Sequence, residues 1–275
     1  MTMTTTQPAV RSADGTTIGV SVSGSGPAVV LVDGALCYRG MGPATKLAAA
    51  LADQFTVYTY DRRGRGESTD TTPYSTKREV EDLAAVIALA GGEADVYAIS
   101  SGVIVALDAA GHAGPGGRGI GIRRLALYEA PLVTDGSRPP VADHIADQME
   151  SLVQDGKRGA AVRLFMQAVG VPGFVVRLMR LMPAWLKLTG VAHTLPYDFR
   201  FMDGLQAGRA LPADRWAAVT VPTLVMAGGK SPEWMRQANQ ELSAVLPAAH
   251  YRVLPGQTHT LKASAAAPVL AEFFS

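Results

Sequence analysis

A run of five apolar residues, Ala28–Val32, most constrains the fold that this sequence can adopt. Three of the five are valine and no polar residue interrupts them, which is typical of a strand buried on both faces of a sheet. Further strand-like runs follow at residues 55–60, 95–99, 124–128, 221–227 and 251–254, with helical patterns between most of them. This alternation predicts an α/β fold with a mostly parallel sheet and helices on both faces.

The chain is expected to open with an antiparallel hairpin. Strands are predicted at 11–14 and 17–23, because Asp14-Gly15 suits the positive φ of a tight turn. Helices are predicted at 46–53, 76–90, 103–110, 232–245 and 261–274, and residues 111–121 are interpreted as a surface connection. At the start of the second helix, Thr76 and Glu79 have the spacing of a capping box.

The pattern changes between residues 134 and 216. Helical periodicities at 141–153, 160–169 and 174–181 are broken by prolines, at Pro172, Pro183 and Pro196, and no convincing strand is found. We interpret residues 134–216 as a helical lid inserted into an α/β core that consists of residues 1–133 and 217–275.

Composition argues against several classes of protein. With 25 basic and 24 acidic residues the formal charge is +1, and no long basic stretch indicates a nucleic-acid partner. Cys37 is the single cysteine and the five histidines are scattered, so neither a disulfide nor a metal site is predicted, and no cofactor is expected. No apolar run approaches the roughly 18 residues of a membrane span. We therefore expect no membrane partner, a cytoplasmic location and a loose N-terminal tail.

A sharp turn at Ser100 carries the strongest chemical signal. The strand ending at Ile99 is followed at once by a helix, and Ala98 and Gly102 supply small neighbours two positions on either side of the serine. Such an elbow lifts the hydroxyl out of the sheet and sets it beside a helix N-terminus, where free N–H groups favour developing negative charge. Ser100 is therefore predicted to be a nucleophile, although Ala98 stands where a glycine is usual.

A base for this serine is predicted near the end of the sequence. His259 follows the strand at 251–254 and precedes the last helix. Alone among the five histidines, it lies beyond the carboxyl end of a predicted core strand and late enough for the order serine, acid, histidine. His259 is therefore the predicted general base.

Taken together, these segments resemble the α/β-hydrolase family over nearly the whole chain. Three further stretches agree, at 32–35, at 60–68 (Tyr-Asp-Arg-Arg-Gly-Arg-Gly-Glu-Ser) and at 222–226. The resemblance implies an eight-stranded sheet and an oxyanion hole formed by the backbone N–H groups of Ala35 and Ser101. It also implies hydrolysis of a small-molecule substrate.

Two positions depart from the family pattern. Asp33 stands where the oxyanion loop usually has histidine; its carboxylate could accept a hydrogen bond from the substrate or brace the loop, and we favour bracing. Ser231 stands where the acid of the triad is usual. Since a histidine base needs a carboxylate to orient it, Glu129, at the end of the strand 124–128, is the first candidate for the acid and Glu233 the second.

Three functions stay open on this evidence. The first is a serine hydrolase that cleaves an ester, thioester or lactone of a small, largely apolar substrate through an acyl-enzyme on Ser100. The second is a lyase or cyclase that uses His259 as a proton shuttle, and the third is a degenerate ligand-binding protein. In each case Asp33, Tyr38, His193 and Trp234 are predicted to line the pocket.

Overall fold

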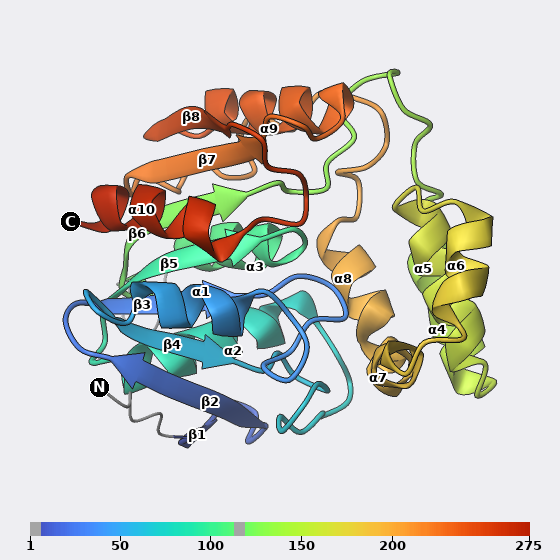
Figure 1. Cartoon of the computed structure of the whole chain (residues 1–275), viewed down its shortest axis with the longest axis horizontal. Coiled ribbons are helices and arrows are strands. Elements are labelled where there is room, and N and C mark those ends of the chain that lie inside the picture. Colours follow the sequence, from blue (N-terminus) through green and yellow to red (C-terminus); the bar gives the residue numbers. More distant parts are fainter. Residues whose placement is uncertain (1–6, 113–118) are drawn as a thin grey trace.

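A computed structural model describes residues 7–112 and 119–275. Residues 1–6 of the predicted N-terminal tail (1–10) and part of the glycine-rich connection at 111–121 lie outside the described residues, whereas Ala9 and Val10 of that tail belong to the first strand. In the described ranges the chain forms a central sheet flanked by helices, with a second group of helices to one side (Figure 1).

The sheet has eight strands in the order β1-β2-β4-β3-β5-β6-β7-β8. Their bounds are β1 (Ala9–Arg11), β2 (Thr17–Gly24), β3 (Ala28–Val32), β4 (Thr56–Tyr60), β5 (Ala94–Ile99), β6 (Ile122–Tyr128), β7 (Thr223–Gly228) and β8 (Ala249–Leu254). The β1–β2 and β2–β4 pairs are antiparallel, and all the other pairs are parallel. The predicted fold class, a mostly parallel eight-stranded sheet, is confirmed.

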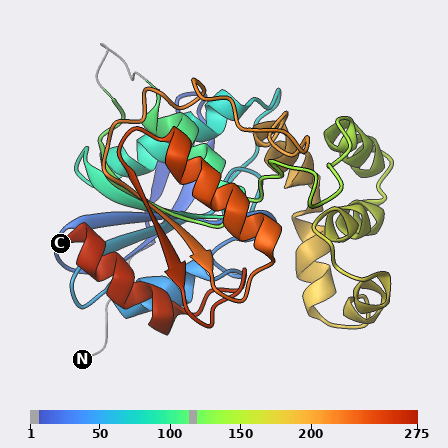
Figure 2. The same ribbon diagram turned by 90° about the horizontal axis from the view of Figure 1, so that it is seen from above.

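Helices cover both faces of the sheet (Figure 2). One face carries α1 (Ala44–Leu51) and α10 (Ala263–Phe274); the other carries α2 (Thr76–Leu89), α3 (Gly102–Ala110) and α9 (Glu233–Val245). In β3, Val29 and Leu31 pack on the first side while Val30 and Val32 pack on the second. This alternation explains the uninterrupted apolar run, because successive side chains of a strand point to opposite faces.

A group of short helices, which we call the helical segment (residues 145–201), connects β6 to β7 and lies beyond one end of the sheet (Figures 1 and 2). It contains α4 (Ile145–Gln154), α5 (Arg158–Ala168), α6 (Gly173–Met179), α7 (Ala184–Gly190), the 3-10 helix η2 (Ala192–Thr194) and α8 (Leu195–Phe201). It occupies the place of the predicted lid, and its role as a lid stays a prediction.

Prolines begin helices in this segment. Pro172 and Pro183 precede the first residues of α6 and α7, and Pro196 lies in the first turn of α8. Proline suits these places because the first N–H groups of a helix have no partner within it. The sequence analysis treated the prolines only as breaks, and it therefore missed α7 and α8.

The capping box predicted for α2 is wrong. Ser75 is the N-cap residue, it makes no side-chain capping bond, and Thr76 is already helical. The Glu79 carboxylate is buried and accepts from the Arg62 guanidinium, with 2.8 Å between Oε1 and Nη2. A buried arginine binds a carboxylate more strongly than a backbone N–H at the start of a helix does.

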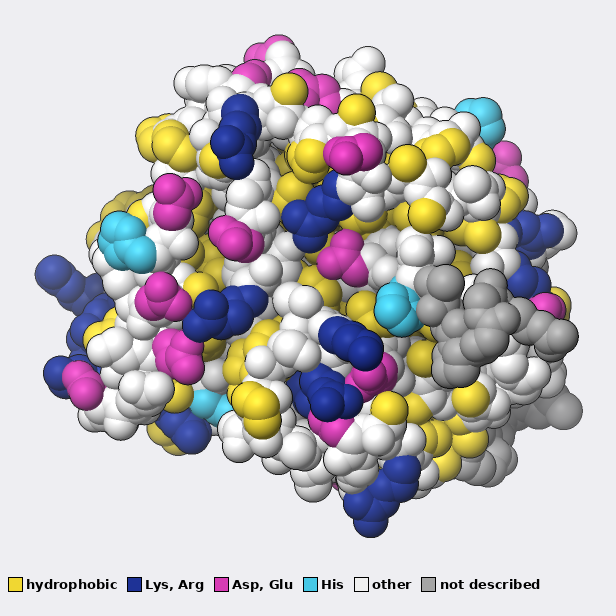
Figure 3. All heavy atoms as spheres, turned by 180° about the vertical axis from the view of Figure 1, so that it is seen from behind, with side chains coloured by type: hydrophobic (Ala, Val, Ile, Leu, Met, Phe, Trp, Pro, Cys, Tyr) yellow, Lys and Arg dark blue, Asp and Glu magenta, His cyan; other side chains and the backbone are white. Residues whose placement is uncertain are grey.

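Charged and apolar side chains are mixed on one face of the molecule, whereas large exposed apolar side chains, among them Phe174, Leu181 and Leu186, gather on α6, α7 and the turn between them. On the face drawn in Figure 3, basic and acidic groups alternate with apolar ones. No helix in the described ranges is both long and apolar enough to cross a membrane.

Candidate active site

Ser100 occupies a strained turn between β5 and α3. Its φ is 58°, in the left-handed region that residues other than glycine rarely adopt. A side chain at Gly102 would place its Cβ 2.7 Å from the Asp33 carbonyl oxygen, so the turn needs glycine there. The predicted elbow is thus present, with Ala98 fully buried on the strand side.

The loop after β3 lies directly against this serine. A Cβ at Gly34 would lie 2.8 Å from the Ser100 Cβ and 3.3 Å from its Oγ. Within the described residues, the N–H groups of Ala35 and Ser101 donate no hydrogen bond to another protein atom. Two free donors therefore flank the serine, which is what an oxyanion hole requires.

Glu129 and His259 form a hydrogen-bonded pair. The Glu129 Oε2 is 2.8 Å from the His259 Nδ1, and its Oε1 accepts from the Gly228 N–H at 2.7 Å. The Glu129 side chain is fully buried, whereas that of His259 is 44% exposed. Glu129 also has a positive φ, 48°. The carboxylate is thus fixed, and it presents the imidazole so that its other nitrogen, Nε2, stays free for chemistry.

Two residues that the sequence analysis missed hold this pair. The Tyr128 hydroxyl donates to the Thr258 carbonyl at 2.6 Å, next to His259. At Gly228, a Cβ would lie 2.5 Å from the Gln257 carbonyl oxygen, so a larger residue would displace the histidine loop. The Gly228-Gly229 pair after a predicted strand was the one signal of this close approach.

Ser100, Glu129 and His259 follow β5, β6 and β8, respectively. The carboxyl ends of parallel strands meet at one edge of a sheet, which is where such sheets bind ligands. No hydrogen bond joins the Ser100 hydroxyl to the His259 ring among the described residues. Bonds of this kind are commonly long in unliganded enzymes and tighten with substrate.

The polar loop after β4 forms buried ion pairs beneath the site. Arg63 binds Asp82, with 2.7 Å between Nη2 and Oδ1, and also Asp14. Arg62 binds Glu79 and, at 2.7 Å, Asp198 of α8. The ion pair between Arg62 and Asp198 joins the core to the helical segment.

Asp33 is buried against the start of α1. A Cβ at Gly42 would lie 2.8 Å from its Oδ2, so the carboxyl is directed toward the loop that leads into that helix. Burial raises the pKa of Asp33 to about 7, although Arg65 and Arg62 act to lower it. These surroundings favour bracing of the loop over contact with a substrate.

The other predicted pocket residues have separate surroundings. Tyr38 is half-buried and pairs through its backbone with Met41. The His193 ring lies beside Gly64, where a Cβ would be 3.2 Å from its Nε2, and burial lowers its pKa. The Trp234 ring stacks under the Arg138 guanidinium, 4.5 Å away. No contact in the described structure joins these side chains to one another, and their role in substrate binding stays a prediction.

The alternative acid, Glu233, does not lie beside the histidine. Its carboxylate is exposed on the first turn of α9, and its one hydrogen bond in the described structure is with Gln237, at 3.5 Å. Ser231, at the place usual for the acid, is buried, and its hydroxyl has no hydrogen-bond partner among the described residues.

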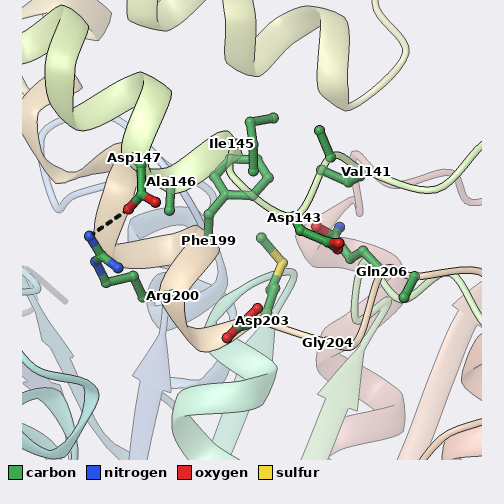
Figure 4. Close-up of a pocket in the computed structure, with 13 residues that line it drawn as sticks. Val141, Asp143, Ile145, Ala146, Asp147, Phe199, Arg200, Asp203, Gly204 and Gln206 are labelled. Atoms are coloured by element: carbon green, nitrogen blue, oxygen red, sulfur yellow. Dashed lines mark hydrogen bonds and ion pairs between the residues drawn. The ribbon is translucent and has the colours of Figure 1, made fainter.

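A cavity of about 380 Å³ lies between α4, α8 and the loops that flank them, and not at Ser100 (Figure 4). It is lined by Val141, Asp143, Ile145, Phe199 and Asp203, among others. Arg200, on its rim, is paired with Asp147. None of the predicted catalytic residues lines this cavity, so we do not take it as the site of reaction.

Comparison with known proteins extends these observations. The profile of the alpha/beta hydrolase family matches residues 21–271. An alpha/beta hydrolase from Sphaerobacter thermophilus DSM 20745 is 48% identical, with a TM-score of 0.87 over 98% of this chain and 100% of that one. No curated protein sequence matches the chain.

Two more distant structures share the fold alone. The enol-lactonase from Burkholderia xenovorans LB400 is 19% identical, with a TM-score of 0.69 over 97% of this chain and 99% of that one. A bottromycin epimerase is 20% identical, with a TM-score of 0.64 over 98% and 99%. A lactonase and an epimerase catalyse different reactions on this fold. The fold therefore does not identify the reaction of this chain, which must be inferred from its site.

Proposed function

The chain belongs to the alpha/beta hydrolase family, and from this premise we propose that it is a serine hydrolase acting on an ester, thioester or lactone of a small, largely apolar molecule. The observation that carries the proposal is the buried Glu129 carboxylate on the His259 imidazole, at the sheet edge where Ser100 stands on its elbow. A surface histidine without a function would not require a fully buried carboxylate that is hydrogen-bonded to its Nδ1.

The reaction proceeds through an acyl-enzyme. The Ser100 Oγ attacks the carbonyl carbon while His259 Nε2 accepts the hydroxyl proton, and the resulting oxyanion is held by the N–H groups of Ala35 and Ser101. The imidazolium then gives the proton to the leaving group as its bond to the acyl carbon breaks. Water then attacks the acyl carbon while His259 Nε2 accepts its proton, and the imidazolium returns that proton to the Ser100 Oγ as the bond between Oγ and the acyl carbon breaks. Glu129 orients the imidazole and stabilises the imidazolium in both steps.

The helical segment serves as the lid in this proposal. Its α8 is tied to the residue after the nucleophile, with 2.7 Å between Ser101 Oγ and Asp198 Oδ1. Buried apolar side chains of this segment, such as Phe199, pack against the core. Such a cover favours a small apolar substrate, because apolar lining gives most of the binding free energy in enclosed pockets.

Turnover of a series of p-nitrophenyl esters by wild type, Ser100→Ala and His259→Ala tests the proposal, together with fluorophosphonate labelling read by mass spectrometry. Both substitutions are expected to lower kcat at least about 1,000-fold, and Ser100→Ala to abolish the adduct. Ser243→Ala is the matched control, since this serine is half-buried on α9 and its hydroxyl bonds only the Gln240 carbonyl in the described structure. A Ser100→Ala variant that keeps turnover and labelling would overturn the proposal.

One observation favours a second candidate, a non-hydrolytic lyase or cyclase. The Ser100 hydroxyl makes no hydrogen bond with His259 in the described structure, so the histidine could move substrate protons on its own. Wild type that neither labels nor cleaves any ester, while binding small ligands, would favour this candidate or a binding protein.

A further inference from the structure

A buried carboxylate from the helical segment contacts the residue that follows the nucleophile. Asp198 on α8 is fully buried, and its Oδ1 accepts from the Ser101 hydroxyl at 2.7 Å. The same oxygen accepts from Arg62 Nη1 at 2.7 Å, and Oδ2 accepts from Arg65 Nη2 at 2.7 Å. Asp198 is therefore the common partner of Ser101 and of both arginines.

One of these arginines also holds the loop on the other side of the nucleophile. Arg65 Nη1 donates to the Gly34 carbonyl at 2.7 Å. That carbonyl belongs to the same peptide group as the N–H of Ala35, and a peptide group is planar. Fixing the carbonyl therefore fixes the direction of the N–H, and a bonded carbonyl also makes its N–H a stronger donor.

The charges of this cluster depend on one another. Arg62 and Arg65 are balanced by Glu79 and Asp198, and all four side chains are at most 2% exposed. Burial acts to raise the pKa of Asp198, but Arg65, Arg62 and hydrogen bonds outweigh it, so that the pKa is lowered. The carboxylate is thus ionised over the working range of pH, and losing it would leave one cation without a partner.

We propose that Asp198 is a positioning residue for the oxyanion hole: from the helical segment, it holds both N–H donors, Ser101 through its hydroxyl and Ala35 through Arg65. The inference rests on the proposed function for its kinetic consequences. On this proposal the helical segment covers the substrate and also helps to stabilise the transition state.

The kinetic test compares Asp198→Asn with Tyr197→Phe. Tyr197 is the neighbouring residue on α8 and bonds Asp70 of the core at 2.8 Å, so its variant also removes a tie between helix and core, but one that does not reach the nucleophile. Asp198→Asn is expected to lower kcat about 30- to 100-fold with KM changed less than about threefold, because oxyanion contacts act in the transition state. Tyr197→Phe is expected to stay within about twofold of wild type.

The affinity for a trifluoromethyl ketone distinguishes a role in the oxyanion hole from a purely structural role. Its adduct with Ser100 places an oxyanion in the hole, so its affinity is expected to fall by about the same factor as kcat in Asp198→Asn. Equal losses in Asp198→Asn and Tyr197→Phe, or a loss confined to KM, would overturn the inference.

A milder variant covers the case in which Asp198→Asn does not fold. Ser101→Ala removes only the hydroxyl, leaves the backbone donor in place, and is expected to lower kcat about 5- to 10-fold. In the double variant the two effects should not multiply and kcat should match that of Asp198→Asn, since the Ser101 contact is one of those that Asp198→Asn already removes. Simple multiplication of the two effects would contradict a shared role.

Hydrogen exchange separates a failure of this inference from a failure of the proposed function. In folded Asp198→Asn or Ser101→Ala, amides at 34–37 and 100–103 are expected to exchange faster, whereas those at 256–262 stay unchanged. This result does not require the protein to be a hydrolase. Unchanged exchange in the first two ranges would overturn the inference even if ester turnover is confirmed, and absent turnover with altered exchange would overturn only the proposed function.

Discussion

Two sides of Ser100 are built in different ways. The acid–base side (Tyr128, Glu129, Gly228 and His259) comes from β6, β7 and β8 and the loop after β8, which are neighbours in the sheet. The Glu129 carboxylate contacts His259 and the Gly228 N–H, and the Tyr128 hydroxyl contacts the Thr258 carbonyl. The sheet alone is therefore sufficient to assemble it.

The oxyanion side (Gly34, Ala35 and Ser101, with Arg62, Arg65 and Asp198 behind them) needs a contribution from outside the sheet. Asp198 reaches Ser101 across 97 positions of the sequence and Arg62 across 136. The comparison indicates that the Glu129–His259 pair is held by the core, whereas the Gly34 loop and Ser101 are held by buried charges that the helical segment completes. The predictions below test this division.

The largest effect is expected on the acid–base side, for Glu129→Gln. A neutral amide cannot stabilise the imidazolium and permits the wrong tautomer of His259, so kcat should fall about 1,000- to 10,000-fold in a p-nitrophenyl ester assay. Near-normal turnover would exclude Glu129 as the acid.

Adding Ser231→Asp to this variant sharpens the prediction. The Ser231 loop lies beside the histidine loop, with 2.8 Å between the Lys230 N–H nitrogen and the Gln257 carbonyl oxygen. An aspartate there is expected to recover kcat about tenfold or more relative to Glu129→Gln. Ser231→Asp alone should fold and serves as the control.

On the oxyanion side, Gly34→Ala is expected to lower kcat about 100-fold. Its Cβ would lie 2.8 Å from the Ser100 Cβ, which forces the loop and the Ala35 N–H away from the serine. Gly136→Ala is the matched control, because nothing lies within 4 Å of a Cβ there. Equal kinetics for the two variants would show that the Gly34 loop takes no part in turnover.

The buried Asp33 carboxyl predicts a pH dependence of stability. Because burial raises its pKa to about 7 in the folded state, the folded state binds the proton more tightly than the unfolded state does. The resulting stabilisation is complete below the unfolded pKa and is lost as pH rises through about 7. Between pH 5 and 8, wild type should therefore lose about 2 kcal/mol of unfolding free energy relative to Asp33→Asn. Parallel urea-unfolding curves for the two proteins at every pH would contradict this.

A smaller effect is expected for Tyr128→Phe. Loss of the bond to the Thr258 carbonyl should loosen the histidine loop, lower kcat about tenfold and cost about 1 kcal/mol of stability. Tyr251→Phe also removes a bond from a tyrosine hydroxyl to a carbonyl, that of Arg236 at 3.0 Å, but this bond does not hold the histidine loop. It should cost similar stability and leave kcat within about twofold.

The smallest effect is expected for Glu233→Gln. This exposed carboxylate has no contact with His259 in the described structure, so kcat should change less than about twofold. A loss comparable to that of Glu129→Gln would reassign the acid of the triad.

The sequence by itself determined the sheet and the elbow at Ser100, and it made Glu129 the first of two candidates for the partner of His259. These follow from local signals: apolar runs of strand length, small residues around a turn, and polar residues that follow neighbouring strands. A carboxylate and a histidine beyond strands of one parallel sheet must meet at the same edge, because their strands all point the same way.

Only the tertiary structure decided the partners of the buried charges. Glu79 has the spacing of a capping box and instead binds Arg62, and Asp198 lies on a short helix that the sequence analysis missed. A buried ion pair is selected by desolvation and by what else is buried nearby, and neither leaves a periodic signal in the sequence. The support of the oxyanion side was therefore hidden until the helical segment was placed against the core.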